Sequence, residues 1–235
     1  DDLDYLIGIH LRPIEELPYG KITPSVRHGA SEILLVDIVG LDAHGARPHQ
    51  GINSIDVCCS IIQTVNNIHM NPQIPYSVKA TMVSSGGYAY NVIPGKARIA
   101  FELRAQTNDL MSALKNRLID TIIKGANMYD AVAEYNFKGQ VPAAQDSDDL
   151  ILIAKDSITK VLGESGLSDC IITSGGEDFH LYAQSIEGLK TTIIGVGADL
   201  APGLHKPNMK FKQEAIIDAS KVLALMVTNI LNNSN

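Results

Sequence analysis

The sequence lacks several features that define common classes of protein. It has no Trp and only four Phe and eight Tyr, which is too few aromatic side chains for a protein that binds nucleic acid by stacking on bases. The 19 Lys and Arg stand against 26 Asp and Glu, so the formal net charge is −7 at pH 7, which argues against binding of a phosphate backbone. The longest apolar runs, such as 222–227, fall far short of the ~18 residues that a membrane span needs. We therefore expect neither nucleic acid nor a membrane as a partner.

Cysteine is also scarce. Cys58 and Cys59 are adjacent and Cys170 stands alone, so the three residues do not form a disulfide framework, and we expect a cytoplasmic protein. No basic, apolar and small-residue series typical of a signal peptide opens the sequence. The chain starts at Asp1 without Met and runs directly into an apolar segment. We interpret this start as that of a fragment or a processed chain.

The middle of the sequence has the pattern of a small, separate domain. Strand-like segments at 32–40, 76–85, 97–104 and 131–137 alternate with helix-like segments at 53–69 and 108–128. The resulting order is β-α-β-β-α-β, which is that of a ferredoxin-like fold. We therefore predict one compact unit within residues 30–138, a normal domain size.

The segments on either side of this unit have a different pattern. Apolar strands at 6–11, 170–173 and 191–197 alternate with helices at 148–162 and 212–231. They have the composition expected of pieces of one α/β sheet that the middle unit interrupts. The predicted fold class is α/β, with an α+β insertion.

Three loops of the outer segments carry polar residues that a plain connection would not need, and ligand sites in α/β sheets form beyond the carboxyl ends of strands. His10 lies in an apolar strand, where it must be hydrogen-bonded in the core or bind a metal. His205 lies in a loop bounded by Gly and Pro, and is either a rigid ligand or a surface residue. Glu177 and Asp178 follow small residues and either approach a ligand or complement a helix dipole.

The middle unit carries its own candidate residues. His44 lies in the stretch 40–51, which is rich in Gly and His, and Asn91 and Arg104 add hydrogen-bond donors. Donors of this kind bind a carboxylate or stabilise an oxyanion. Taken singly, each of the three has a structural explanation as well.

Five short motifs together resemble the M20 family of metallopeptidases and amidohydrolases. The motifs are residues 8–13 (GIHLRP), 43–49 (AHGARPH), 90–94 (YNVIP), 176–179 (GEDF) and 204–207 (LHKP). They occur in the order of the family and cover nearly the whole chain. The most similar branch is the one that contains aminoacylases and hippurate or N-acyl-amino-acid hydrolases.

The resemblance implies an architecture and a set of roles. Residues 1–29 and 140–235 would be pieces of a zinc-dependent catalytic domain, and residues 30–139 would be a ferredoxin-like lid that forms a homodimer. His10 and His205 resemble metal ligands, and His44 resembles the lid histidine that polarises the scissile carbonyl in the active site of the neighbouring subunit. The remaining matches resemble substrate-contacting or pocket-lining residues: Asn91, Arg104, Gly176, Glu177 and Asp178. Of these, Arg104 is the expected partner of the substrate carboxylate.

One part of the family pattern has no counterpart here. The other metal ligands and the Glu-Glu pair that supplies the general base lie upstream of the strand that carries His10. No His or Cys precedes His10, and Asp1, Asp2 and Asp4 are too close to that strand to replace them. The chain therefore resembles the C-terminal part, about three fifths, of such an enzyme.

Three functions follow as hypotheses. The first is a metal-dependent hydrolase of amide bonds in N-acyl amino acids or small peptides, with one or two zinc ions by default and manganese or cobalt as alternatives. The second is a non-catalytic scaffold that forms dimers through residues 30–139. The third is a ferredoxin-like regulatory domain that binds a small ligand through His44 and Arg104, and it ranks last because it leaves His10 and His205 unexplained.

Overall fold

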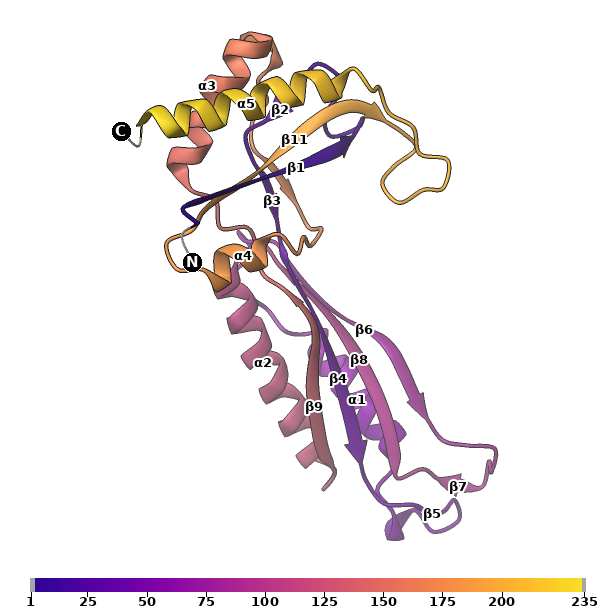
Figure 1. Cartoon of the computed structure of the whole chain (residues 1–235). Coiled ribbons are helices and arrows are strands. Elements are labelled where there is room, and N and C mark those ends of the chain that lie inside the picture. The colour runs from indigo at the N-terminus through magenta and orange to yellow at the C-terminus, as the bar shows by residue number, and fades with distance from the viewer. Residues whose placement is uncertain (1–2, 234–235) are drawn as a thin grey trace. The chain divides into compact units, whose positions relative to one another are not determined.

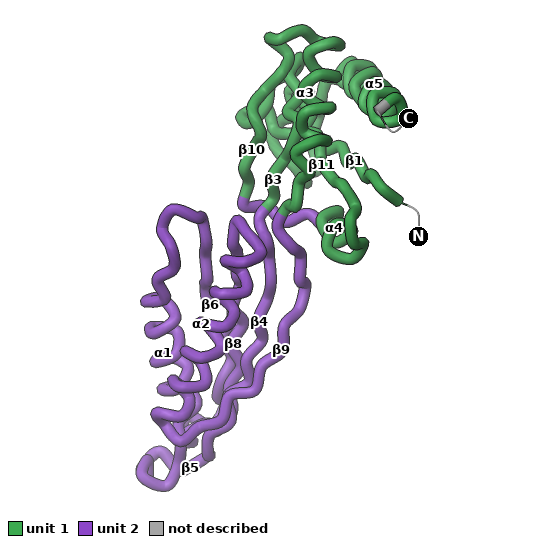
Figure 2. Tube along the Cα trace, turned by 90° about the vertical axis from the view of Figure 1, so that its left-hand side faces the viewer, with its two compact units in different colours: residues 1–28, 144–173, 178–235 green, residues 29–143, 174–177 purple. Residues whose placement is uncertain are grey.

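The computed structural model describes residues 3–233 (Figure 1). Asp1 and Asp2, on which the interpretation of the chain start depends, lie outside the described residues. Two compact units are distinguished in Figure 2: unit 1 comprises residues 1–28, 144–173 and 178–235, and unit 2 comprises residues 29–143 and 174–177. The boundaries predicted from the sequence lie after residues 29 and 139, and the predicted middle unit does not include 174–177.

Unit 2 contains a four-stranded antiparallel sheet. Its strands, in the spatial order β6-β8-β4-β9, are β6 (Tyr76–Ser85), β8 (Lys96–Ala105), β4 (Ala30–Val39) and β9 (Val132–Val141). The first and third strands along the chain are neighbours at the centre, and the second and fourth form the edges. This arrangement has the strand order expected for a ferredoxin-like unit.

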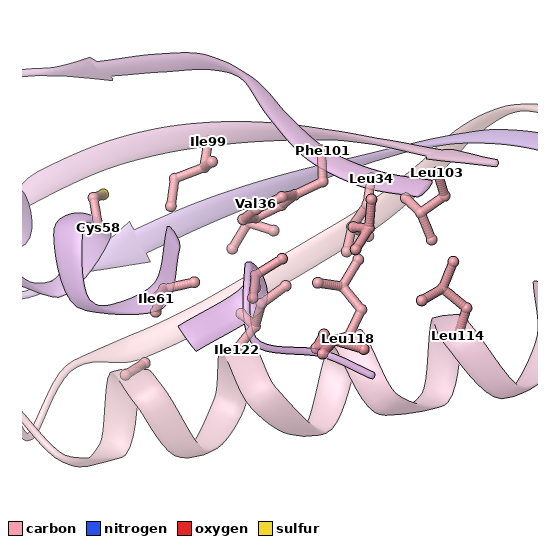
Figure 3. Close-up of a cluster of buried hydrophobic side chains, with 14 of the residues drawn as sticks. Leu34, Val36, Cys58, Ile61, Ile99, Phe101, Leu103, Leu114, Leu118 and Ile122 are labelled. Carbon is pink, nitrogen blue, oxygen red and sulfur yellow. The ribbon is translucent and has the colours of Figure 1, made fainter. Parts of the chain in front are cut away.

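Two helices provide the other half of the core of unit 2. In Figure 3, side chains of α1 (Ser54–Val65) and α2 (Asn108–Asn127) meet those of the sheet. Phe101, Leu34 and Leu118 have no exposed surface in this core, as apolar residues at helical and strand spacing predict. The start of α2 is capped by the Thr107 side chain, which accepts a hydrogen bond from the backbone of Leu110.

Short elements that the sequence analysis did not predict lie between the strands of unit 2. β5 (Ala43–His44) pairs antiparallel with β7 (Val92–Ile93), and the 3-10 helix η1 (Pro48–Gln50) follows β5. These two-residue strands are too short to produce a periodic signal. They place the 43–49 and 90–94 motifs side by side.

Unit 1 is built on two small sheets instead of the single sheet that the sequence suggested. β1 (Tyr5–Pro13) pairs in parallel with β11 (Lys190–Leu200), and β11 also pairs with β2 (Ile22–Thr23). β3 (Val26–His28) pairs in parallel with β10 (Ile171–Thr173). β2 and β3 are not predicted from the sequence, because they are short and flank Pro24 and Ser25 in a stretch with the composition of a loop.

Three α-helices and one 3-10 helix complete unit 1. They are α3 (Asp148–Leu162), η2 (Glu164–Gly166), α4 (His180–Ser185) and α5 (Ala215–Asn233). Within residues 3–233, α5 is the single helix long and apolar enough, by length and composition, to cross a membrane, a property that the search for uninterrupted apolar runs overlooked. Ala219, Val222 and Met226 of this helix are nevertheless buried in the core of unit 1.

Candidate functional site

His10 lies in the second half of β1, opposite Gly195 of β11, and is half-buried. Its Nδ1 is 2.6 Å from the carbonyl oxygen of Leu11. A carbonyl only accepts hydrogen bonds, so in a neutral His10 ring Nδ1 carries the proton and Nε2 carries the lone pair. This hydrogen bond therefore selects the tautomer in which Nε2 is able to coordinate a metal ion.

Two further histidines lie beside His10 in unit 1. His28 at the end of β3 is 3% exposed, and His180 at the start of α4 is 1% exposed. Nδ1 of His28 and Nε2 of His180 are 3.2 Å apart and share a hydrogen bond. Burial, together with the neighbouring His180, Arg12 and His10, lowers the pKa of His28 to about 3, and burial also lowers the pKa of His180. Both imidazoles are therefore neutral at physiological pH.

A buried carboxylate belongs to the same region of unit 1. Oδ2 of Asp146 accepts hydrogen bonds from Ser25 Oγ at 2.6 Å and from Arg27 Nε at 3.0 Å. The charge of Asp146 opposes the effect of burial on the pKa of His180. Among the described residues, Asp146 Oδ1 and His180 Nδ1 are the buried side-chain atoms without a hydrogen-bond partner. The interior of unit 1 thus holds an unusually polar cluster.

His28, His180 and Asp146 are not among the candidate residues that the sequence predicts. His28 ends a three-residue strand and His180 begins a six-residue helix, so neither lies in an element with a readable period. The one available signal was that His180 directly follows the 176–179 motif.

His205 lies in a loop of unit 1 that is closed at its base. The backbones of Ala201 and Lys210 exchange two hydrogen bonds, of 3.1 and 2.9 Å, across residues 201–210. His205 itself is exposed and has a φ of 60°, a left-handed conformation that is uncommon for residues other than Gly. The loop is therefore held at its ends, and His205 takes a sterically restricted position within it.

His10 and His205 fit a metal ion only in part. Imidazole nitrogens are good ligands for zinc and related divalent ions, but a catalytic zinc site takes three protein ligands. Within residues 3–233, no group of three or more His, Cys, Asp or Glu side chains is arranged to hold a metal ion. His10 and His205 thus have the right chemistry for ligands, and a complete coordination sphere needs donors in addition to those described.

The 176–179 motif lies just before α4. The backbone of Gly175 accepts a hydrogen bond from Gly29 at 3.1 Å, within unit 2. Glu177 is half-buried and Asp178 is exposed. The helix α4 begins at His180 with no acidic residue in its first turn, and the carbonyl of Asp178 accepts a hydrogen bond of 2.9 Å from Leu181 just before it, so both explanations of the two acids stay predictions.

His44 and Asn91 lie together in unit 2, where β5 pairs with β7. The backbone of Gly45 donates a hydrogen bond to the carbonyl of Asn91 at 2.7 Å. His44 and Asn91 are both exposed. His44 Nδ1 accepts a hydrogen bond of 3.0 Å from the backbone of Ala46. A neutral His44 therefore carries its proton on Nε2, and this N–H is a donor.

Arg104 lies toward the opposite end of the same sheet. His44 and Asn91 are near the start of β8, because the backbone of Gly95 bonds the side chain of Asp42, whereas Arg104 is near the end of β8. At about 3.3 Å per residue, the eight steps from Lys96 to Arg104 span about 26 Å. The structure therefore does not bring Arg104 together with His44 and Asn91 within one chain.

Arg104 lines a cavity of about 290 Å³ within unit 2. The cavity is lined by Gly29, Pro75, Tyr76, Ser77, Arg104, Ala105, Gln106 and Ser174. Nε of Arg104 contacts Glu102, and Nη1 donates to the carbonyl of Ser174 at 3.1 Å. A guanidinium has five N–H donors, so these two bonds leave it able to bind a carboxylate as well.

Comparison with known proteins identifies the family. The model of peptidase family M20/M25/M40 matches residues 1–229, and the chain belongs to this family. The chain is 28% identical to IAA-amino acid hydrolase ILR1-like 2 of Arabidopsis thaliana, over 98% of this chain and 54% of that protein. It is 23% identical to the N-acetyl-L-cysteine deacetylase of Bacillus subtilis, over 100% of this chain and 56% of that protein.

A solved structure has the same fold. The YXEP protein of Bacillus subtilis, described as a dinuclear metal-binding peptidase of the M20 family, superposes with a TM-score of 0.76 at 21% identity. The match covers 97% of this chain and 58% of that one. The chain thus spans little more than half the length of the relatives that it matches.

Proposed function

We propose that this chain is the metal-binding and lid portion of a hydrolase that cleaves amide bonds in N-acyl amino acids or small peptides. The observation that carries the proposal is the pair of fixed tautomers in the two histidines of the family motifs. His10 presents a nitrogen with a lone pair, as a ligand must, and His44 presents an N–H, as a donor to a carbonyl must. The names of the two curated relatives, a hydrolase of an amino acid conjugate and an N-acetyl deacetylase, support the substrate class.

Zinc is the proposed metal, as one or two divalent ions, with manganese or cobalt as alternatives. His10 and His205 would hold it together with ligands from outside the described residues. When bound, such an ion polarises a carbonyl and lowers the pKa of a bound water. The role of His10 is to supply Nε2 in a fixed direction, and the role of the closed loop 201–210 is to limit the positions open to His205.

The residues of unit 2 would act on the substrate. His44 Nε2–H would donate to the oxygen of the scissile carbonyl as charge develops there, and Asn91 would add a second donor beside it. Arg104 would bind the substrate carboxylate, and Gly176, Glu177 and Asp178 would line the substrate pocket. Because Arg104 lies about 26 Å along β8 from Lys96, the end of the strand near which His44 lies, the two would serve one substrate only if they came from different subunits.

A homodimer through residues 30–139 is therefore part of the proposal. The edge strand β6 exposes Met82 and Val83, with exposed fractions of 42% and 51%. An unpaired strand edge with apolar side chains is a natural surface for association. We also propose a cytoplasmic location, because the three cysteines are free thiols.

The activity test is hydrolysis of N-acetyl amino acids and dipeptides by the complete gene product loaded with Zn²⁺, Mn²⁺ or Co²⁺. Replacing His44 by Ala is expected to lower kcat about 100- to 1,000-fold, the effect of losing one oxyanion donor, with metal content unchanged. His49→Ala is the matched control, since His49 is an exposed histidine of the neighbouring helix η1. Wild-type rates in the His44→Ala variant would remove this residue from the mechanism.

A non-catalytic dimeric scaffold is the second candidate, and the partial donor set favours it. Within the described part of the chain, the side chains do not assemble a three-ligand metal group. A gene product that forms dimers but neither takes up stoichiometric metal nor hydrolyses any of these substrates would establish this second function.

A further inference from the structure

The imidazoles of His10, His28 and His180 form a row inside unit 1. The ring centroids of His10 and His28 are 6.0 Å apart, and those of His28 and His180 are 5.4 Å apart. Both separations are within the range at which aromatic rings pack against each other. His28 is therefore in contact with both neighbours, through ring packing on one side and through a hydrogen bond on the other.

The far end of this row is anchored to the strand that carries His10. The Phe179 ring contacts the His180 ring edge-on, with centroids 5.8 Å apart. A Cβ on Gly8 would lie 3.0 Å from an atom of the Phe179 ring, so this ring packs directly on β1, two residues before His10. The series of ring contacts thus begins at His10 on β1 and ends at Phe179, which packs on Gly8 of the same strand.

His28 is also held by its own backbone. β3 pairs with β10 through His28 and Thr173, and the carbonyl of His28 accepts a hydrogen bond of 2.9 Å from Ala144. With its backbone fixed in this way and its ring bonded to His180, His28 has little freedom to rotate. A rigid ring of this kind is able to restrict the ring beside it.

We propose that His28, fixed by its hydrogen bond to His180, is a positioning residue that holds the ring of His10. In this arrangement His10 Nδ1 stays on the carbonyl of Leu11 and Nε2 keeps the direction in which a divalent cation would be bound. The part of the inference that concerns the cation rests on the proposed function, whereas the part that concerns the His10 ring does not. Residues that orient a metal ligand typically change metal affinity about 10- to 100-fold when they are replaced.

The direct readout is the tautomer of His10 in the chain without metal, measured by ¹⁵N–¹H correlation of the histidine rings. Wild-type His10 is expected to show one neutral tautomer, protonated at Nδ1. His28→Ala removes the packing ring, and His180→Phe keeps the aromatic contact with Phe179 but removes the hydrogen-bonding nitrogen. In both variants His10 is expected to become a mixture of tautomers, whereas the control His69→Ala, at an exposed histidine of unit 2, should leave it unchanged.

The second readout is the affinity for Zn²⁺, measured by competition with a chelator on the same samples. Both variants are expected to bind Zn²⁺ about 10- to 100-fold more weakly than the wild type. If His28→Ala fails to fold, His180→Phe decides the result alone. An unchanged His10 tautomer in a folded variant overturns the inference, and so does X-ray absorption that counts His28 among the metal ligands.

The two readouts separate this inference from the proposed function. If zinc uptake does not depend on His10, the proposed ligand role fails, while the tautomer of His10 still tests the positioning role of His28. If zinc uptake depends on His10 and both variants keep the wild-type tautomer and affinity, the positioning role fails alone.

Discussion

The interiors of the two units differ in kind. Unit 2 has a large apolar core, and among its described residues the buried polar ones are Glu32 and Ser54. Unit 1 buries more polar side chains among its described residues: Arg12, Thr23, Ser25, His28, Ser157, His180, Thr191 and Thr192. Burying a polar group costs free energy unless it is hydrogen-bonded. Unit 2 is therefore organised for apolar packing, whereas unit 1 keeps buried polar side chains that are held by hydrogen bonds, such as Ser25 to Asp146 and His28 to His180.

The largest effect on stability is expected from a cavity in unit 2. Phe101 has no exposed surface in the core shown in Figure 3, so Phe101→Ala should lower the free energy of unfolding by about 3–5 kcal/mol. Urea unfolding of the whole chain measures the change. Leu152→Ala, at a residue 66% exposed on α3, is the control, and a similar loss in the two variants would show that unit 2 does not depend on its apolar core.

A smaller but still substantial effect is expected from the polar interior of unit 1. Asp146→Ala leaves Ser25 Oγ and Arg27 Nε without their acceptor, which should cost about 2–3 kcal/mol. Asp120→Ala removes an exposed carboxylate that pairs with Lys124 on α2, and it should cost no more than about 0.5 kcal/mol. Equal costs for these two variants, measured by the same unfolding assay, would erase the distinction between the units.

The next effect concerns the start of α2. Thr107→Ala removes the side-chain acceptor for the backbone of Leu110, and losses of this kind cost about 1 kcal/mol. Ser112→Ala is the control within the helix, since Ser112 only bonds the preceding turn at Asn108. Thermal unfolding should show the lower Tm for Thr107→Ala, and a lower Tm for the control alone would assign the cap elsewhere.

The smallest effect is expected from chemical labelling, which tests the apolar core of unit 2 without a substitution. Burial raises the pKa of the Cys58 thiol to about 11, whereas Cys59 is exposed. Only the thiolate reacts, so iodoacetamide at pH 8 should label Cys59 and leave Cys58 unmodified in the native chain. Fragmentation of the peptide that contains both residues locates the label by mass spectrometry. Prompt labelling of Cys58 would mean that α1 opens readily.

The length of an element decided whether the sequence predicted it. In unit 2 the strand at 76–85 was predicted with the bounds that the structure has, as was the helix at 148–162 in unit 1, because long periodic segments reflect local packing. The ferredoxin-like order followed from the sequence of such segments. β2, β3 and α4 were missed because two to six residues carry no period.

The residues of the candidate site fall into those that short motifs identify and those that only the fold brings together. His10, His44 and His205 were recognised from short motifs, and their roles stay predictions. His28 and His180 were not recognised, because their significance depends on a ring contact across about 150 residues of sequence that only the fold creates. The separation of Arg104 from His44 likewise depends on the direction of β8, which the motifs do not contain.

The central proposal is that His10 of one subunit and His44 of the other would serve one active site, as the proposed homodimer implies. The most direct test mixes two inactive variants of the complete gene product, His10→Ala and His44→Ala, after dissociation and reassociation of the subunits. In a symmetric dimer, random pairing should restore about a quarter of the wild-type activity, since half of the dimers are mixed and each contains one intact site. A mixture that stays inactive although mixed dimers form, as mass spectrometry of the intact dimer would show, contradicts the claim.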